Sequence, residues 1–393
     1  MEKLKIMSVY GTRPEAIKLA PVISALEKDD RFESIPVSTG QHKEMLDQVN
    51  RMFGIAPAFD LELMKDGQSL NNLVSRALTG LDSILERVRP DVIIVQGDTS
   101  TAMAAAIAGF HRKAKVVHLE AGLRTGDIES PFPEEVNRSI ISRVASLHLA
   151  PTQGTFENLK AEGICEDDIV ITGNTVIDAL FEAVTWNTTF VDPALQDIER
   201  SNARTVVVTT HRRENLSALE KIGSAIHHLA AEYPEVRFVL PLHSNPAVRS
   251  VLLPEVKHLS NVVVTNPLPY DQFTKLLNFA TLVLSDSGGI QEEAPSLGTP
   301  VLVMRDKTER PEALDAGTVK LVGTDKERIV IEAQKLLSDP TEFNMMVNAV
   351  NPFGDGFVTQ RTIAAIGSLL GVSEGPKPFV PNYEHRLRQI GSR

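Results

Sequence analysis

The chain has 393 residues, with 40 Lys and Arg against 51 Asp and Glu, so its formal charge is −11. This acidic balance argues against general nucleic-acid binding, because a protein that neutralises many phosphates usually carries an excess of basic side chains. The content of 42% hydrophobic and 23% charged residues is typical of packed globular proteins and excludes a largely disordered chain. The length is sufficient for two domains, each with its own core.

Cysteine content and the N-terminal segment indicate the compartment. The single cysteine, Cys165, cannot form an internal disulfide or supply a cysteine-based zinc site, which fits a reducing compartment. The first apolar run is interrupted by Gly11 and Arg13 and is too short for a signal peptide. No stretch reaches the ~20 apolar residues that a bilayer crossing needs. The sequence therefore predicts a cytoplasmic protein without a membrane partner.

In the first half of the chain, apolar runs of strand length alternate with stretches of helical periodicity. This pattern is typical of βα units and a mainly parallel sheet. The expected strands are residues 4–10, 34–38, 91–96, 115–119, 147–150 and 169–172. The expected helices are residues 16–26, 70–88, 102–111 and 136–144. We expect a doubly wound α/β domain over residues 1–173.

The same alternation restarts after a polar, proline-containing stretch at residues 190–202, which places a domain boundary between residues 173 and 202. The expected strands of the second series are residues 205–209, 236–241, 261–265, 282–285, 300–304 and 319–322. The expected helices are residues 216–231, 271–279, 289–296 and 326–337. A second doubly wound domain is thus expected over residues 174–357, followed by a helix at 358–370 that could pack on either domain.

The first expected strand ends in a loop that could bind an anion. Arg13 and Lys18 follow this strand, and Pro14 marks the start of a helix. Ligands of open α/β sheets bind outside the carboxyl ends of the strands, where helix N-termini favour anions such as a diphosphate. An ordinary solvated turn is at least as compatible with this spacing. Neither a Walker loop nor a GxGxxG fingerprint is present, which disfavours P-loop and dinucleotide-binding proteins.

Three carboxylates follow expected strands or begin an expected helix in this half. Asp98 and Glu120 come just after two strands, and Glu134 lies in the first turn of a helix. Acidic residues are common at helix starts because of the helix dipole, so one alone would mean little. Three that converge on one cleft would be costly unless they transferred protons or bound a ligand.

The second half carries polar clusters at equivalent places. His211 and His243 each follow a strand, and either could assist a leaving phosphate, move a proton or simply cap a helix. The stretch Ser287, Gly288, Gly289 lies between a strand and a helix and would expose backbone N–H groups to a diphosphate, although a tight turn without a ligand has the same pattern. No metal-binding spacing of the HExxH or paired Cys/His kind is present.

Taken together, the motifs resemble the non-hydrolysing UDP-N-acetylglucosamine 2-epimerases of bacteria. They span nearly the whole chain in order: GTRPEAIKLAP, TGQHKEML, GDTSTAMAAA, HLEAGLRTGD, SPFPEEVNR, ITGNTVIDAL, THRREN, SDSGGIQEEAPSLGTPVLVMRDKTERPEA and NPFGDG. The resemblance implies a GT-B-like architecture in which two Rossmann-like domains face each other across a cleft. In it, the C-terminal segment 358–393 completes the N-terminal domain, and residues 174–357 form the UDP-binding domain.

The implied activity is reversible interconversion of UDP-GlcNAc and UDP-ManNAc, which supplies ManNAc-type sugars for cell-surface polysaccharide synthesis. The family acts as homodimers without NAD or an essential metal, so no cofactor is expected. A hydrolysing epimerase and a GT-B glycosyltransferase are the alternatives. A nucleotide-sugar sensor fits least well, because it would not need the three carboxylates.

The resemblance also assigns roles to individual positions. The implied catalytic residues are Asp98, Glu120, Glu134 and His211. The implied substrate-binding residues are Arg13, Lys18, Phe273, Ser287, Gly288, Gly289, Glu293 and Arg310. Residues near the family's allosteric UDP-GlcNAc site are Gln41, His42, Arg212 and His243. Leu268 replaces a Gln that is frequent in the family on the uracil side.

Overall fold

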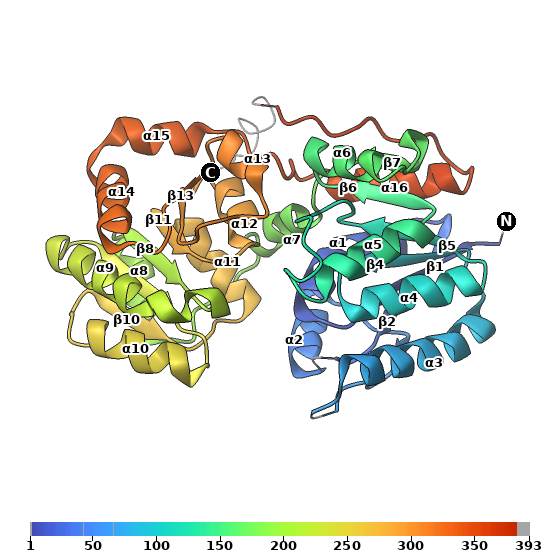
Figure 1. Cartoon of the computed structure of the whole chain (residues 1–393), viewed down its shortest axis with the longest axis horizontal. Coiled ribbons are helices and arrows are strands. Elements are labelled where there is room, and N and C mark those ends of the chain that lie inside the picture. The colour runs from blue at the N-terminus through green and yellow to red at the C-terminus, as the bar shows by residue number, and fades with distance from the viewer. Residues whose placement is uncertain (1, 42, 66, 383–393) are drawn as a thin grey trace. The chain divides into compact units, whose positions relative to one another are not determined.

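The computed structural model describes residues 2–41, 43–65 and 67–382, and in it the chain forms two compact units (Figure 1). The N-terminal unit comprises Met1–Ala179 with Phe353–Val380, and the C-terminal unit comprises Leu180–Pro352. Each unit is built on a parallel sheet with helices on both faces. The expected fold class, α/β with two Rossmann-like doubly wound domains of the GT-B-like kind, is confirmed.

The described part of the N-terminal unit contains a seven-stranded parallel sheet. From one edge to the other its strands are β3 (Phe59–Asp60), β2 (Phe32–Ser38), β1 (Leu4–Tyr10), β4 (Val92–Gln96), β5 (Lys115–Leu119), β6 (Leu147–Ala150) and β7 (Ile169–Ile171). Every residue of β4 is buried, as expected for a strand covered on both faces.

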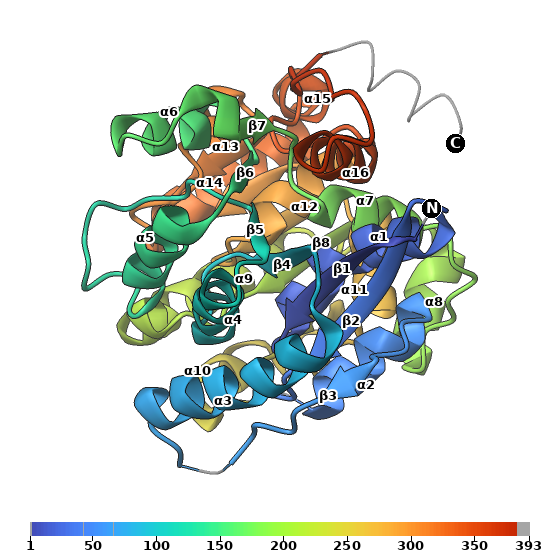
Figure 2. The same cartoon turned by 90° about the vertical axis from the view of Figure 1, so that its right-hand side faces the viewer.

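Helices cover both faces of this sheet (Figure 2). One face carries α1 (Arg13–Lys28), α2 (Lys43–Phe53) and α16 (Val358–Leu369). The other carries α3 (Leu70–Val88), α4 (Ser100–His111) and α5 (Glu134–Val144). At the β7 edge of the sheet, α6 (Gln153–Ala161) packs against β7, and α7 (Val176–Ala183) follows β7 in the chain.

The C-terminal unit contains a six-stranded parallel sheet in its described residues. Its strands are, in order, β10 (Val262–Thr265), β9 (Arg237–Pro241), β8 (Thr205–Thr209), β11 (Leu282–Ser285), β12 (Val301–Val303) and β13 (Val319–Leu321). Its helices are α8 (Pro193–Ser201), α9 (Leu219–Glu232), α10 (Pro246–Val256), α11 (Tyr270–Phe279), α12 (Ile290–Ser296), α13 (Pro311–Asp315), α14 (Lys326–Ser338) and α15 (Pro340–Asn348).

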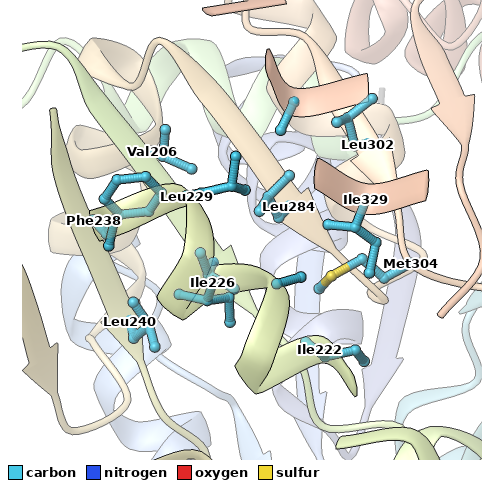
Figure 3. Packing of buried hydrophobic residues seen from close by; sticks show 14 of the residues in the cluster. Val206, Ile222, Ile226, Leu229, Phe238, Leu240, Leu284, Leu302, Met304 and Ile329 are labelled. Atoms are coloured by element: carbon cyan, nitrogen blue, oxygen red, sulfur yellow. The ribbon is translucent and has the colours of Figure 1, made fainter. Parts of the chain in front are cut away.

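The core of the C-terminal unit lies between the sheet and α9, α10 and α14 (Figure 3). Leu229 and Ile226 of α9 pack with Phe238 of β9, and Ile329 of α14 packs beside Met304. Burying one such side chain contributes about 1.5–3 kcal/mol. The apolar stripe of α9 and the buried strands thus hold the carboxyl ends of β8 and β11 in place.

Both sheets have a switch point, where consecutive connections run in opposite directions across the sheet. The switch lies between β1 and β4 in the N-terminal unit and between β8 and β11 in the C-terminal unit. Ligands of doubly wound sheets bind outside the carboxyl ends of such strands. A ligand site is therefore expected at the loops that begin at Gly11, Gly97, Thr210 and Asp286.

The C-terminal segment 353–380 packs on the N-terminal unit. The carboxylate of Asp178 accepts hydrogen bonds from the backbone N–H groups of Val358 and Thr359 at the start of α16, at 3.2 and 3.1 Å. Burial raises the pKa of Asp178 to about 6. The buried residue Phe379 donates its backbone N–H to the carbonyl of Ile171 at 2.7 Å, which ties the segment to β7.

Several helices were not among those expected. The polar stretch at 190–202 contains α8, whose cap Asp192 accepts a hydrogen bond from the Ala194 N–H and is followed by Pro193 at the first helical position. Similarly capped helices, α10 and α15, follow Asn245 and Asp339. In the described ranges, 2–41, 43–65 and 67–382, no helix combines the length and apolar character needed to cross a bilayer.

Candidate active site

Glu120 lies directly after β5, and its carboxylate is surrounded by donors. Lys18 of α1 donates from Nζ to Oε1 at 2.6 Å and to Oε2 at 2.5 Å. Asn174 donates from Nδ2 to Oε1 at 3.1 Å, and Gln96 donates from Nε2 to Oε2. Only 7% of the Glu120 side chain is exposed. Both carboxylate oxygens thus have donors from other elements, which hold the side chain in one orientation.

Asp98 lies after the neighbouring strand, β4, and is paired with an arginine. Arg138 of α5 contacts Asp98 Oδ2 from Nε at 2.9 Å and from Nη2 at 2.7 Å. The same guanidinium reaches Glu135 at 3.0 Å, and the Asn137 amide donates to the Asp98 carbonyl at 2.8 Å. The residues of α5 therefore hold the loop that carries Asp98.

Glu134, the third expected carboxylate, is the first residue of α5 and is half-buried. It lies about one helical turn before Arg138, the partner of Asp98. The neighbouring carboxylate of Glu135 accepts hydrogen bonds from the backbone N–H groups of Thr125 and Gly126, at 3.0 and 3.1 Å. Glu135 thus ties the start of α5 to the loop at Thr125 and Gly126, and Glu134 is its neighbour in the chain.

The loop after β1 is organised by a buried carboxylate that sequence reasoning did not select. Glu15 accepts the backbone N–H groups of Gly11 at 3.0 Å and Thr12 at 2.7 Å, and the Thr99 hydroxyl at 2.6 Å. Burial raises the pKa of Glu15, against the opposing effect of these hydrogen bonds. Glu15 links the loops after β1 and β4, and Arg13 lies in the loop that it holds.

Two buried histidines lie on neighbouring strands, and one of them is close to Glu120. His118 of β5 pairs in register with His148 of β6, and His118 Nε2 lies 2.7 Å from the carbonyl of Gly97. Burial lowers the pKa of His118 to about 3 and that of His148 to about 4. An unfolded chain protonates histidine near pH ~6.5, so stability is lost as the pH falls from there toward these lower values.

We expect the His148→Gln variant to lose less stability in acid than the wild type. Its free energy of unfolding should fall less steeply, by about 1 kcal/mol per pH unit between about pH 6 and about pH 4.5, because one proton uptake of the unfolded state is removed. Asp178 and Glu15 are present in both proteins, so their contributions to the pH dependence of stability cancel in the comparison. Denaturant unfolding across this range measures it. His111→Gln, at an exposed position, is the control, and equal slopes for wild type and His148→Gln would contradict the expectation.

In the C-terminal unit, His211 follows β8 and lies against a fully buried carboxylate. Asp286 accepts the backbone N–H of His211 at 3.0 Å and that of Arg212 at 3.0 Å. It also accepts the Thr210 hydroxyl at 2.8 Å and the Asn215 amide at 3.1 Å. His211 Nδ1 lies 3.4 Å from Asp286 Oδ1, which leaves Nε2 for another partner.

The His211 ring also stacks on His243, with centroids 5.9 Å apart and planes tilted by 20°. Burial lowers the pKa of His211, and Asp286 has a smaller, opposite effect. The neutral imidazole is therefore favoured relative to an exposed histidine. A neutral ring that is oriented by a carboxylate is suited to exchanging a proton near neutral pH.

The glycine turn after β11 is lined by arginines. A Cβ added to Gly288 would lie 3.0 Å from Arg310 Nη1 and 3.5 Å from Arg212 Nη2. Arg310 is buried, and Glu292 of α12 holds its Nε at 2.6 Å. Two guanidinium groups thus approach a turn that has no side chain to block them, an arrangement suited to a diphosphate.

The remaining expected positions are spread over both units. Glu293 is buried and accepts the Tyr270 hydroxyl at 3.3 Å, and Phe273 lies half-buried on α11. Gln41 of the N-terminal unit accepts the Thr101 hydroxyl at 3.2 Å. His42 lies outside the described residues. The expected allosteric set therefore has Gln41 in one unit, and Arg212 and His243 in the other.

Comparison with known proteins decides the family. A family model described as UDP-N-acetylglucosamine 2-epimerase matches residues 24–367, most of the chain. The chain belongs to this family. The family expected from the sequence motifs is thereby confirmed, and its non-hydrolysing type stays a prediction.

Relatives and solved structures in the UDP-N-acetylglucosamine 2-epimerase family match this chain over nearly its whole length. The Yersinia pestis UDP-N-acetylglucosamine 2-epimerase is 48% identical over 369 residues, which cover 92% of this chain and 98% of that protein. The Escherichia coli K12 enzyme of the same name is 46% identical over 377 residues, with coverages of 92% and 98%. The crystal structure of the Neisseria meningitidis UDP-GlcNAc 2-epimerase bound to UDP-GlcNAc has a TM-score of 0.85 and 42% identity, covering 93% of this chain and all of that one.

Within this member of the epimerase family, several polar residues at the candidate site were missed by sequence reasoning. They are Glu15, Gln96, Arg138, Asn174 and Asp286. Four of them lie inside the quoted motifs, and Gln96 is the last residue of an expected strand. Position near a strand end was the available signal for all of them except Arg138, which lies in α5. Among the described residues, no group of three or more His, Cys, Asp or Glu side chains is arranged to hold a metal ion.

Proposed function

We propose that this chain reversibly interconverts UDP-GlcNAc and UDP-ManNAc by inverting C2 without hydrolysis. Membership of the UDP-N-acetylglucosamine 2-epimerase family supports the substrate class. The observation that carries the proposal is the pair of carboxylates after neighbouring strands, with Glu120 held by Lys18 and Asp98 held by Arg138. A protein that only bound the nucleotide sugar would have no use for this pair.

The chemistry explains why more than one carboxylate is needed. The C2 proton is not next to a ring carbonyl, so direct removal by a side chain would be too slow. In the proposed elimination the C1–O bond breaks with its electron pair leaving on UDP, a base takes the C2 proton, and the double bond of 2-acetamidoglucal forms. Addition reverses both steps, with the proton arriving at the opposite face of C2. The atoms and electrons balance without an oxidant or reductant.

A base and an acid on opposite faces of the sugar are therefore required. We assign proton transfer to Glu120 and Glu134, with Asp98 essential to the same network. The developing charge on UDP would be stabilised by Arg13, Arg310 and the turn Ser287–Gly289, with His211 assisting the loss and return of UDP. Glu293 would contact the ribose, and Phe273 would lie near the uracil.

The same proposal includes assembly and pathway. We infer a homodimer, on the basis of the family resemblance, and a product that supplies ManNAc-type sugars for cell-surface polysaccharide synthesis. The mass of the protein in solution, measured by light scattering, tests the first point. A monomeric mass would contradict the inferred homodimer and would leave the proposed epimerisation unaffected.

The activity is tested by incubating the protein with UDP-GlcNAc in D2O. We expect UDP-ManNAc that carries deuterium at C2, because the returning proton comes from a group that exchanges with solvent. Proton NMR and mass spectrometry read the position and amount of the label. Free ManNAc would show a hydrolysing epimerase, and an unlabelled sugar with no epimer would leave transfer to an acceptor or nucleotide-sugar sensing as the alternatives.

A further inference from the structure

Asn174 lies between β7 and α7 and is anchored on three sides. Its backbone N–H donates to the Phe353 carbonyl at 2.6 Å, and its side-chain Oδ1 accepts the Val176 N–H at 3.2 Å. Its Nδ2 donates to Glu120 Oε1 at 3.1 Å. The residue is 2% exposed. An asparagine whose side chain accepts the first N–H of α7 thus also contacts a carboxylate to which we assign proton transfer.

The orientation of this amide follows from its partners. The N–H of Val176 can only donate, so the oxygen of the Asn174 amide must face it. This leaves the NH2 group directed to Glu120, and a carboxylate is the acceptor that it needs. Both ends of the amide are matched, so rotation by 180° would break two hydrogen bonds at once.

The backbone on either side of Asn174 has little room to move. Gly173 has φ of +90°, a left-handed conformation that favours glycine, and a Cβ there would lie 3.0 Å from the Phe353 carbonyl oxygen and 2.8 Å from Val358. Arg361 of α16 donates to the Thr172 carbonyl at 3.3 Å. The segment 172–176 is therefore clamped by the returning segment 353–361.

Glu120 itself needs such support. Its φ of +59° is the left-handed region, which is unfavourable for a residue with a long side chain. Lys18 bonds both of its oxygens, and a flexible ammonium can follow the carboxylate as it turns. The amides of Asn174 and Gln96, on different oxygens, are directional and fix the plane of the carboxylate.

We propose that Asn174 is a positioning residue that fixes the carboxylate of Glu120 for proton transfer, with the returning segment 353–361 as its support. The inference rests on the proposed function. A misplacement of a reacting group by about 1 Å can lower a rate by about 10²-fold, which is large enough to measure.

The Asn174→Asp variant separates the two roles of the side chain. The new carboxylate keeps an acceptor for the Val176 N–H, because Asp has an acceptor oxygen in the place of the Asn174 Oδ1. It loses the donor to Glu120 and places a second negative charge beside it. We expect kcat to fall by about 10- to 100-fold while KM and the affinity for UDP change less than about threefold.

A pH profile distinguishes positioning from a merely structural effect. Two carboxylates this close take up a shared proton more readily than one alone, and the protonated pair regains an O–H donor between the oxygens. Lys18 of α1 and His118 of β5 also face Glu120, and burial keeps His118 neutral with a pKa of about 3. The kcat of Asn174→Asp relative to wild type should therefore rise at least about threefold from about pH 8 to about pH 5.5.

Two further variants complete the test. Asn261→Asp is the control for general destabilisation. Asn261 is buried in the C-terminal unit, and its amide donates to three backbone carbonyls. This variant should lose stability without the pH-dependent change in kcat. Asn174→Ser keeps a short acceptor but cannot reach Glu120, and its loss of kcat should not depend on pH. If thermal unfolding shows that Asn174→Asp does not fold, Asn174→Ser takes its place. A lower kcat with an unchanged KM in Asn174→Ser then supports the positioning role, and a kcat near wild type contradicts it.

The outcomes are separable from those of the proposed function. If wild-type protein gives no deuterated epimer, the proposed function fails. If the wild type is active and Asn174→Asp keeps kcat within about threefold, or loses kcat equally at every pH, Asn174 is not a positioning residue. A kcat loss with unchanged KM and recovery in acid supports the inference.

Discussion

Replacing Glu120 by Gln is expected to lower the turnover number of epimerisation by about 10²- to 10⁴-fold, the range typical of losing a general acid or base. The amide cannot take a proton from C2, and its NH2 group would face Lys18 or one of the two amide donors. UDP affinity should stay within about threefold of wild type, because the residues to which we assign UDP binding lie mostly in the C-terminal unit. Initial rates with UDP-GlcNAc and calorimetric titration with UDP measure the two quantities.

A matched control separates this effect from the loss of an ion pair. Asp82 pairs with Arg112 at 2.5 and 2.7 Å on the surface of the N-terminal unit, at the C-terminal end of α4 and away from the carboxyl ends of β4 and β5. Asp82→Asn should leave turnover unchanged. Asp98→Asn and Glu134→Gln should fall in the same range as Glu120→Gln. Turnover near wild type in any of the three would remove that residue from the proposed proton-transfer network.

All strands of both sheets except the two-residue β3 were expected, because buried parallel strands are short, continuous apolar runs. Residues 4–10, 115–119 and 282–285 were expected as strands and are β1, β5 and β11. The strand ends then indicated where carboxylates and the glycine turn would lie. The positions of Asp98, Glu120 and Ser287 at carboxyl ends of strands follow from topology alone.

Three of the unexpected helices have a common cause. Each of α8, α10 and α15 begins with an Asp or Asn cap and a proline at the first helical position, which is a start signal. The stretch at 190–202, which contains α8, was interpreted as a domain boundary instead. These helices are short, with 9, 11 and 9 residues, and α15 has no buried residue, so the apolar periodicity of α10 and α15 was weak.

Partner choice within the site could not be predicted. Lys18 was expected beside the nucleotide, and in the structure it bonds Glu120, which is 102 residues away in the chain. Asp286 lies directly before the glycine turn in the sequence, yet its carboxylate organises the loop after β8. Such pairings depend on which loops meet across the sheet and on side-chain directions, neither of which periodicity reports.

We expect Asp286→Asn to weaken both the fold and UDP binding. The carboxylate accepts donors from Thr210, His211, Arg212 and Asn215, and in an amide of the same shape one side would present N–H groups to N–H groups. Leaving buried donors unmatched costs about 1.5–3 kcal/mol, which corresponds to a loss of about 5–10 °C in the unfolding midpoint of a domain of this size. Scanning calorimetry measures the shift.

The expected loss of UDP affinity, about 10- to 100-fold, has a separate cause from the loss of stability. Asp286 positions the backbone of Arg212, whose guanidinium approaches Gly288 together with that of Arg310. Asp325→Asn, at the cap of α14 in the same unit, should change neither quantity, since Asn caps a helix as well as Asp does. If Asp286→Asn lowers the midpoint but binds UDP like wild type, the loop after β8 does not hold the diphosphate, and the anion site must be assigned to Arg310 and the glycine turn alone.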